Sequence, residues 1–172
     1  MRCVALCLLL ACTSLAMAAD AVAVMTPTAG NGTTGTITFT KVDGGVQIDA
    51  AISGLSASGT HAIHVHQFGD ARAADGTSAG DHYNPEGHDH GLPHVDERHA
   101  GDLGNLTADE QGNATLSLVV TNLSIDGDHN PVIGRSVIIH AKADDGGQPT
   151  GNAGPRIAIG VIGYAKPATP AE

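Results

Sequence analysis

The stretch HAIHVHQFGD at residues 61–70 places His64 and His66 at alternate positions, between the apolar residues Ile63 and Val65. In an extended strand, side chains two residues apart point to the same face, so the two imidazole rings would lie close enough to bind one metal ion. A solvated polar strand face would give the same alternation. The pair alone therefore leaves a metal site and a solvated face as alternatives.

Further histidines lie in residues 67–113, a segment rich in turn-forming and charged residues and poor in apolar residues that could form a core. Loops of this length are uncommon unless they are functional or disordered, and the composition fits disorder. A bound metal could instead supply the order that apolar burial does not. The histidines of this segment are His82, His88, His90, His94 and His99.

Metal ions such as zinc are bound by imidazole and carboxylate groups that converge from separate segments of a chain. This sequence offers such groups in three places: the 61–70 stretch, the long loop, and the apolar run SVIIH that ends at residue 140. The spacing alone does not identify the metal or the number of ions. The candidate ligands are His64, His66, His82, His88, His90, His94, His99, Asp102 and His140.

Short strands are the elements that would position these side chains. Aromatic residues make up 2% of the 172 residues, whereas the chain holds 23 Gly and 8 Pro, and turn signals such as Asp43-Gly44 separate the apolar segments. Without helical periodicity, this pattern predicts one all-β domain, an antiparallel sandwich or barrel of seven or eight strands. The strand-like segments are residues 21–25, 35–42, 45–52, 62–66, 114–121, 136–141 and 157–163.

The N-terminal residues 1–18 combine one basic residue with an apolar run and end in small residues, which predicts a secretory signal cleaved before Ala19. We therefore expect a domain of residues 19–172 that is exported, to the periplasm or outside the cell. Alternatively, the run that ends at Cys12 is a lipoprotein processing site, and an acylated Cys12 attaches the protein to a membrane. We expect membrane association only in that case.

All cysteines of the chain, Cys3, Cys7 and Cys12, lie within residues 1–18, so we expect no disulfide in the folded domain. That is unusual for an exported protein. The net charge of −10 becomes −11 when Arg2 is removed with the signal. So acidic a domain should repel nucleic acid and anionic membrane surfaces, and we expect neither as a partner.

Several motifs occur together in a fixed order: HAIHVHQFGD, SAGDHYNPEGHDHGLP, ERHAGDLGN, VIGRSVIIHAKADD and PTGNAGPRIAIGVIG. In this combination the chain resembles the Cu/Zn superoxide dismutase family across nearly all of residues 19–172. The resemblance implies a Greek-key β-sandwich or barrel of about eight antiparallel strands with two long functional loops. It also implies copper and zinc as cofactors and superoxide as the small-molecule substrate.

The resemblance assigns the metal ligands position by position. His82 would be shared by the two ions as a bridging imidazolate, and it would also be catalytic as a proton source for the product. The implied copper ligands are His64, His66, His82 and His140, and the implied zinc ligands are His82, His90, His99 and Asp102.

Two further residues match family positions next to the metals. Asp144 would join a copper ligand, His64, to a zinc ligand, His90, and such carboxylates fix the tautomer of a ligating ring. Arg156 would dock the superoxide anion beside copper. The implied reaction is a two-step redox cycle, in which one superoxide reduces copper and leaves as oxygen, and a second reoxidises it and leaves as hydrogen peroxide.

The chain departs from the family pattern where the family has its intrasubunit disulfide. Gly76 and Ile159 stand at the two cysteine positions. Loss of such a bridge typically costs ~2–5 kcal/mol, part of which Ile159 can recover by apolar packing. We therefore expect zinc to contribute an unusually large share of the stability. The loop at residues 142–156 is also shorter than in the common intracellular members.

Three apolar pieces resemble the two-fold interface of the eukaryote-like members of the family, and they predict a homodimer. They are residues 68–69, 133–134 and 160–163, while Tyr164 replaces an aliphatic residue. Two alternatives to an enzyme remain open. The domain could be an exported copper or zinc binding or storage protein with the same fold, or a structural sandwich with a vestigial site.

Overall fold

The structure is a computed structural model that describes residues 19–167. The predicted signal segment and its three cysteines lie outside the described residues. Within them, eight strands alternate with loops, and one short 3-10 helix, η1 (Thr77–Ala79), lies in the loop after the fourth strand. The strands are β1 (Ala21–Pro27), β2 (Thr34–Val42), β3 (Gly45–Ser53), β4 (Thr60–His66), β5 (Asp102–Thr107), β6 (Ala114–Val120), β7 (Ser136–His140) and β8 (Arg156–Tyr164).

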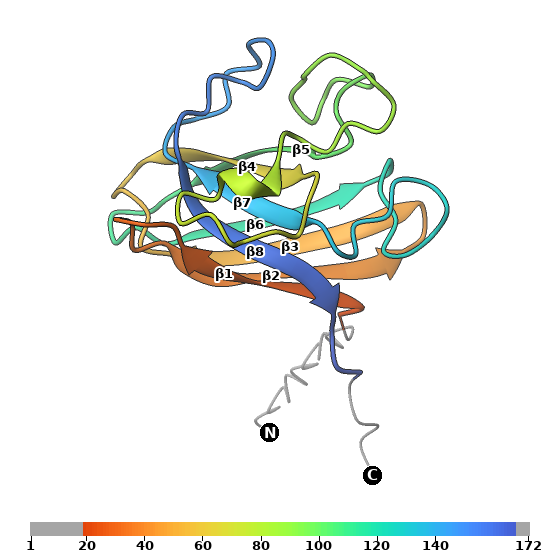
Figure 1. Ribbon diagram of the computed structural model, residues 1–172, viewed down its shortest axis with the longest axis horizontal. Helices are drawn as coiled ribbons and strands as arrows, with labels where there is room; N and C mark the ends of the chain where they lie inside the picture. The colour runs from red at the N-terminus through yellow and green to blue at the C-terminus, as the bar shows by residue number, and fades with distance from the viewer. Residues whose placement is uncertain (1–18, 168–172) are drawn as a thin grey trace, which may run out of the picture.

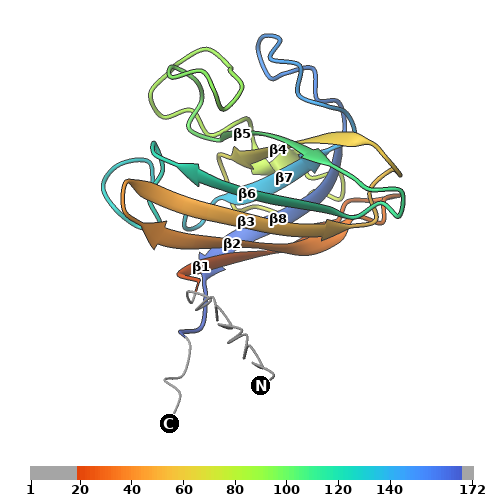
Figure 2. The same cartoon turned by 180° about the vertical axis from the view of Figure 1, so that it is seen from behind.

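All neighbouring strands pair in antiparallel fashion, in the order β5-β4-β7-β8-β1-β2-β3-β6. The two end strands, β5 and β6, also contact one another, so the sheet curls into a nearly closed barrel (Figure 1). The connections from β3 to β4 and from β6 to β7 cross from one part of the barrel to the other, which gives the Greek-key arrangement (Figure 2). The predicted fold class is confirmed.

The barrel core is aliphatic, as the composition requires. In β3 the buried residues Val46, Ile48, Ala50 and Ile52 alternate with more exposed positions, the pattern of a strand with one face toward the core. β4 differs, because every residue from His61 to His66 is buried. Its two faces therefore both lie against protein, and a loop must cover the face that is turned away from the core.

β5 is the strand that the sequence did not predict. We expected residues 67–113 to contain almost nothing that could form a core, but Leu103 and Leu106 of this segment are 1% and 0% exposed. The expectation was wrong because DLGNLT lacks β-branched residues before its last position and contains Gly104 with φ +82°. The register shift in the β4–β5 pairing obscures the alternation further.

Two long loops join strands on the same side of the barrel: residues 67–101 between β4 and β5, and residues 141–155 between β7 and β8. Figure 1 shows both loops rising above the barrel, while the start of β1 and the end of β8 lie at the opposite side. Residues 19–167 contain no helix long and apolar enough to span a membrane. Because β4 and β7 are antiparallel, the loops leave from opposite ends of this strand pair and meet over the face of β4 that is turned away from the core.

Candidate metal centre

His64 and His66 lie on the face of β4 that the two loops cover. Their exposed fractions are 0% and 1%, so the alternative of a solvated polar face is excluded. Ile63 and Val65, on the opposite face of β4, belong to the hydrophobic core. The alternation in the sequence therefore separates a core face from a buried, histidine-lined face.

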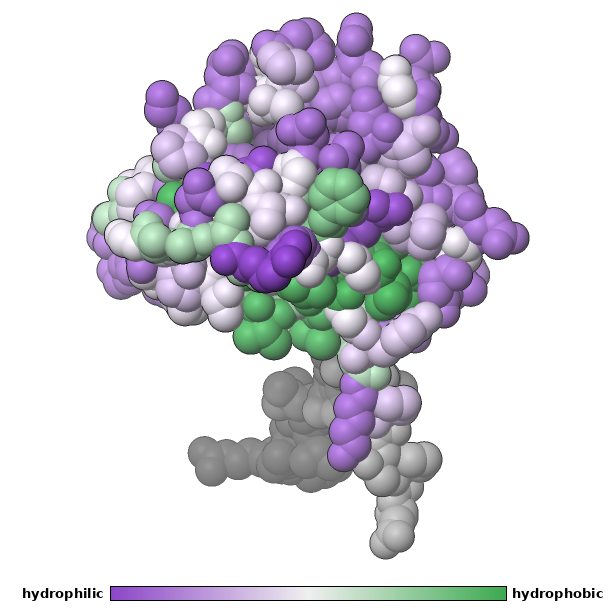
Figure 3. Space-filling model, viewed as in Figure 1, coloured by the Kyte–Doolittle hydropathy of each residue, from purple (hydrophilic) through white to green (hydrophobic). Residues whose placement is uncertain are grey.

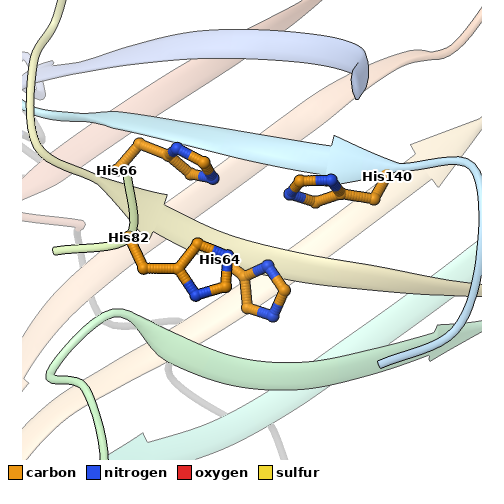
Figure 4. A group of neighbouring side chains, drawn as sticks. All are labelled: His64, His66, His82 and His140. Atoms are coloured by element: carbon orange, nitrogen blue, oxygen red, sulfur yellow. The ribbon is translucent and has the colours of Figure 1, made fainter. Parts of the chain in front are cut away.

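His82 and His140 join these two residues. His140 ends β7, which pairs with β4, and His82 lies just after η1 in a bridge with His66. The rings of His64 and His82 are 3.9 Å apart between centroids, and those of His66 and His140 are 5.6 Å apart. Each of the four residues offers one nitrogen within 4.8 Å of the others. Figure 4 shows the four rings gathered around a common space.

One nitrogen on each of three rings in this group is buried without a hydrogen-bond partner: Nδ1 of His64 and Nε2 of His66 and His140. Buried polar atoms are rarely left unpaired unless an ion or water satisfies them. The other nitrogen of each ring contacts an acceptor that can fix the tautomer. The acceptors are Oδ2 of Asp144 at 2.9 Å for His64, the Gly80 carbonyl at 2.9 Å for His66, and the Gly154 carbonyl at 3.1 Å for His140.

A second group forms around Asp102, the first residue of β5. Its carboxylate oxygens lie 3.0 Å from His82 Nδ1, 2.9 Å from His90 Nδ1 and 3.3 Å from His99 Nδ1. The contact with His90 does not have hydrogen-bond geometry, since His90 Nδ1 has no hydrogen-bond partner. Three imidazoles and one carboxylate, all buried, are a donor set that zinc takes in four-coordinate sites.

His82 and Asp144 connect the two groups. His82 belongs to both, because its Nδ1 faces Asp102 and its ring lies against that of His64. The Asp144 carboxylate contacts His64 Nε2 with one oxygen and His90 Nε2 with the other, both at 2.9 Å. The structure thus brings together the residues to which the sequence assigned two metals and a linking carboxylate.

The protonation of the histidines differs between the two groups. Burial lowers the pKa of His82 to about 4 and that of His140 to about 3, and it lowers the pKa of His66 well below its usual value. These rings are neutral at pH 7, as a metal ligand must be. Burial also acts to lower the pKa of His90, but the adjacent carboxylates of Asp102 and Asp144 outweigh it and raise this pKa to about 9.

Arg156, the first residue of β8, is held by two carbonyl groups of the loop that also carries His82. Its Nη1 donates to the Gly76 carbonyl at 2.7 Å and its Nη2 to the Gly80 carbonyl at 2.6 Å. The Gly80 carbonyl also accepts the bond from His66. Burial lowers the pKa of Arg156, yet a guanidinium remains charged at neutral pH. A fixed positive charge therefore stands beside the four-histidine group.

The two positions of the missing disulfide have different roles. Ile159 is 5% exposed and packs in a small apolar cluster with Ile138 of β7 and Ala79 of η1. Gly76 has φ +75°, a conformation that residues with a Cβ rarely adopt. Apolar contact through Ala79 thus holds the loop against β7 and β8, at one of the positions where the resemblance implied a cysteine.

The remaining candidate histidines stay outside both groups. His88 contacts the Arg98 carbonyl at 3.2 Å, and His94 is exposed. The sequence reasoning missed two amide side chains that contact the backbone of site residues: Asn105 bonds with Asp144, and Gln148 bonds with His90. Neither amide could be singled out, because no titratable or metal-binding group marks it in the sequence.

The sequence of this chain matches the model of a known protein family. The family model for copper/zinc superoxide dismutase matches residues 33–162, which include every residue of both groups as well as Asp144 and Arg156. The match covers most of the described residues. Copper and zinc are the metals of that family, and the two buried donor sets suit them.

Proposed function

The chain belongs to the copper/zinc superoxide dismutase family, and from that premise we propose that it converts two superoxide anions into oxygen and hydrogen peroxide. The observation that carries this proposal is the set of unpaired buried nitrogens on His64, His66 and His140 beside the guanidinium of Arg156. A protein that only binds metal has no need for an anion-binding group at that position.

The two groups of ligands have separate tasks in this proposal. Copper, held by His64, His66, His82 and His140, supplies reversible one-electron exchange with superoxide. The group of His82, His90, His99 and Asp102 holds zinc, which has no redox chemistry in proteins. The second group therefore orders residues 67–101 and fixes the ring of His82.

Arg156 binds and orients the substrate. Superoxide is a small anion, and the acidic protein as a whole, with its net charge of −10, repels it. The guanidinium is held in place through Gly76 and Gly80, so its donors are preorganised and need no rearrangement when the anion arrives. The positive charge of Arg156 thus lies next to the proposed copper ligands, where superoxide must bind.

His82 is the residue that can deliver a proton. Its Nδ1 is engaged at Asp102, so Nε2 is the atom that is left for the other group and for a proton. Burial lowers the pKa of His82 to about 4, and a proton placed on Nε2 is therefore released readily to a basic oxygen. Peroxide needs two protons to leave as hydrogen peroxide; His82 supplies one and solvent supplies the other.

The test is superoxide disproportionation by the purified domain of residues 19–172, reconstituted with copper and zinc. We expect fast activity that falls in Arg156→Ala by about 10- to 100-fold, the equivalent of about 1.5–3 kcal/mol for a hydrogen bond to a charged group. Arg72→Ala is the matched control, because this arginine is 89% exposed and pairs only with Asp70 on the surface. Activity should be unchanged in the control.

Two results would contradict the proposal. Binding of both metals without activity would favour the storage protein that the sequence left open. Equal activity in Arg156→Ala and the parent would show that Arg156 does not bind the substrate.

We also propose that the domain acts after export and as a homodimer. The export proposal rests on the character of residues 1–18, with acylation at Cys12 as the alternative. The dimer proposal rests on the apolar residues exposed over β1, β8 and the start of the first loop, which include Val24, Phe68 and Val161. Apolar side chains gather over this part of the surface in Figure 3.

A further inference from the structure

His90 lies in a stretch of the first loop without regular secondary structure, so no strand pairs with its backbone. The residue is nevertheless 4% exposed. Buried backbone N–H and C=O groups need hydrogen-bond partners, and an unpaired group costs free energy comparable to a lost hydrogen bond. The N–H and C=O groups of His90 must therefore find hydrogen-bond partners elsewhere in the fold.

Gln148, in the second loop, satisfies both groups at once. The His90 N–H donates to Oε1 of Gln148 at 3.0 Å, and Nε2 of Gln148 donates to the His90 carbonyl at 2.8 Å. A side-chain amide suits this task because it carries an acceptor and a donor on one rigid plane. The two bonds bridge segments 58 residues apart in the chain.

The ring of His90 is constrained separately from its backbone. Nε2 contacts Oδ1 of Asp144 at 2.9 Å, while Nδ1 points to Asp102 without a hydrogen-bond partner. Gln148 fixes the backbone from which the ring projects, and Asp144 fixes the rotation of the ring. Together they direct the free Nδ1 toward the other ligands of the second group.

The loop around Gln148 is itself ordered. Oδ1 of Asp145 accepts bonds from the Gly147 N–H at 2.8 Å and from Asn152 Nδ2 at 3.1 Å, and the Gly151 N–H donates to the Gly147 carbonyl at 2.6 Å. These hydrogen bonds hold the turn in which Gln148 lies.

Asn105 of β5 holds the backbone of Asp144 in the same two-point manner, with distances of 2.7 and 2.9 Å. Two residues that meet through their side chains, Asp144 and His90, are thus each fixed by an amide. A side-chain amide therefore binds the backbone of each residue in the contact between Asp144 and His90.

We propose that Gln148 is a positioning residue for His90, and that through it the second loop sets the affinity of the second group for zinc. This inference rests on the assignment of zinc to that group under the proposed function. Because Gln148 is exposed, its two bonds add little to the stability of the whole domain. The bonds instead fix the position of His90 as a metal ligand. Loss of a group that supports a ligand commonly weakens metal binding about 10- to 100-fold.

The experiment measures zinc dissociation constants by competition with a chelator, in the domain already loaded with one equivalent of copper. Gln148→Met keeps the length of the side chain and removes both polar atoms. Gln148→Ala is a second variant in case the first does not fold. Gln111→Met is the matched control, because the side chain of this exposed glutamine makes none of the hydrogen bonds found in residues 19–167.

We expect zinc binding to weaken by about tenfold or more in both Gln148 variants, with copper binding and the unfolding temperature of the metal-free domain unchanged. Unaltered zinc affinity would overturn the proposal. So would equal weakening of zinc and copper together with a lower unfolding temperature, since that pattern reports general loosening of the loop. A parent domain that binds zinc but lacks superoxide activity would refute the proposed function and leave the result for Gln148 standing.

Discussion

Asp144 and Asp102 give His90 an electrostatic environment unlike that of the other ligating histidines. His66 and His140 are surrounded by other imidazoles and by carbonyl groups, and His82 contacts one carboxylate, that of Asp102. His90 instead lies between two buried carboxylates. Burial lowers the pKa of His82 and of His140, whereas at His90 the nearby negative charges outweigh burial and raise the pKa. Residues of the same type therefore have different protonation states within one site.

This difference predicts how metal binding depends on pH. Because the pKa of His90 is raised to about 9, the metal-free ring holds a proton at pH 7 that zinc must displace. Zinc affinity should therefore rise as pH increases from 6 to about 9, by up to about tenfold per unit, and level off above it. Copper affinity should change little between about pH 5 and 8, because His82 and His140 titrate near pH 4 and 3.

Calorimetric titrations in buffers of different ionisation enthalpy would count the protons released with each metal. Added alone to the metal-free domain, zinc should release about one proton per site at pH 7, whereas copper should release none from His82 or His140. Equal pH dependence for the two metals would contradict the assignment of different protonation states.

The first long loop depends on η1 for its attachment to the barrel. Ala79 packs against Ile138 and Ile159. The residues that flank η1, Gly76 and Gly80, carry the carbonyl groups that hold Arg156. This attachment consists of apolar contact among three side chains. The position of the anion-binding arginine therefore depends on a small hydrophobic cluster.

We predict that Ile159→Ala destabilises the domain by about 2–5 kcal/mol and that Ile159→Val costs only about 0.5–1.5 kcal/mol. Ile159→Ala should also reduce superoxide activity, because it loosens the segment whose carbonyl groups hold Arg156. Urea unfolding of the zinc-loaded domain measures the stability. A cost in Ile159→Ala no larger than in Ile159→Val would show that Ile159 does not anchor the loop.

At the scale of the whole molecule, the proposed zinc ligands come from separate elements of the fold. They lie in the first loop and in β5, and Asp144 ties them to the second loop. No disulfide can assist, because residues 19–172 contain no cysteine. Binding of a ligand to the folded state alone stabilises that state in proportion to its affinity.

Complete removal of zinc should therefore lower the unfolding temperature of the domain by about 10 °C, measured by calorimetry at constant protein concentration. Addition of zinc should restore the original value. An unfolding temperature that does not change on zinc removal would refute the view that zinc substitutes for the missing bridge.

The exposed apolar residues over β1 and β8 predict the oligomeric state. Val161 is 43% exposed and adjoins Gly69, which in turn packs against the Gly134 carbonyl, so the three predicted interface pieces meet on one face. We expect Val161→Asp to dissociate the dimer, because burial of an unpaired carboxylate is costly. Val119→Asp is the control, since Val119 is 50% exposed on β6.

Analytical ultracentrifugation would report the masses of the parent and both variants. The parent and Val119→Asp should sediment as dimers and Val161→Asp as a monomer. A monomeric parent would disprove the dimer.

The sequence by itself determined the β class, most of the strands and the identity of the ligand candidates. Alternation along β3 and β4 follows directly from side-chain geometry, and histidines in ordered motifs are distinctive. β5 could not be predicted, because its two core leucines stand among residues of low strand propensity and become buried only through pairing with β4.

Only the tertiary structure decided that neither face of β4 is solvated, since two loops distant in sequence cover the face that carries His64 and His66. It also decided which nitrogen of each ring remains free and which amides support the site. Those properties depend on contacts across 14 to 80 residues of chain, such as those of His66 with Gly80 and of His64 with Asp144, and no local pattern encodes them. The chemistry of the ligands is thus local, whereas their orientation is a product of the fold.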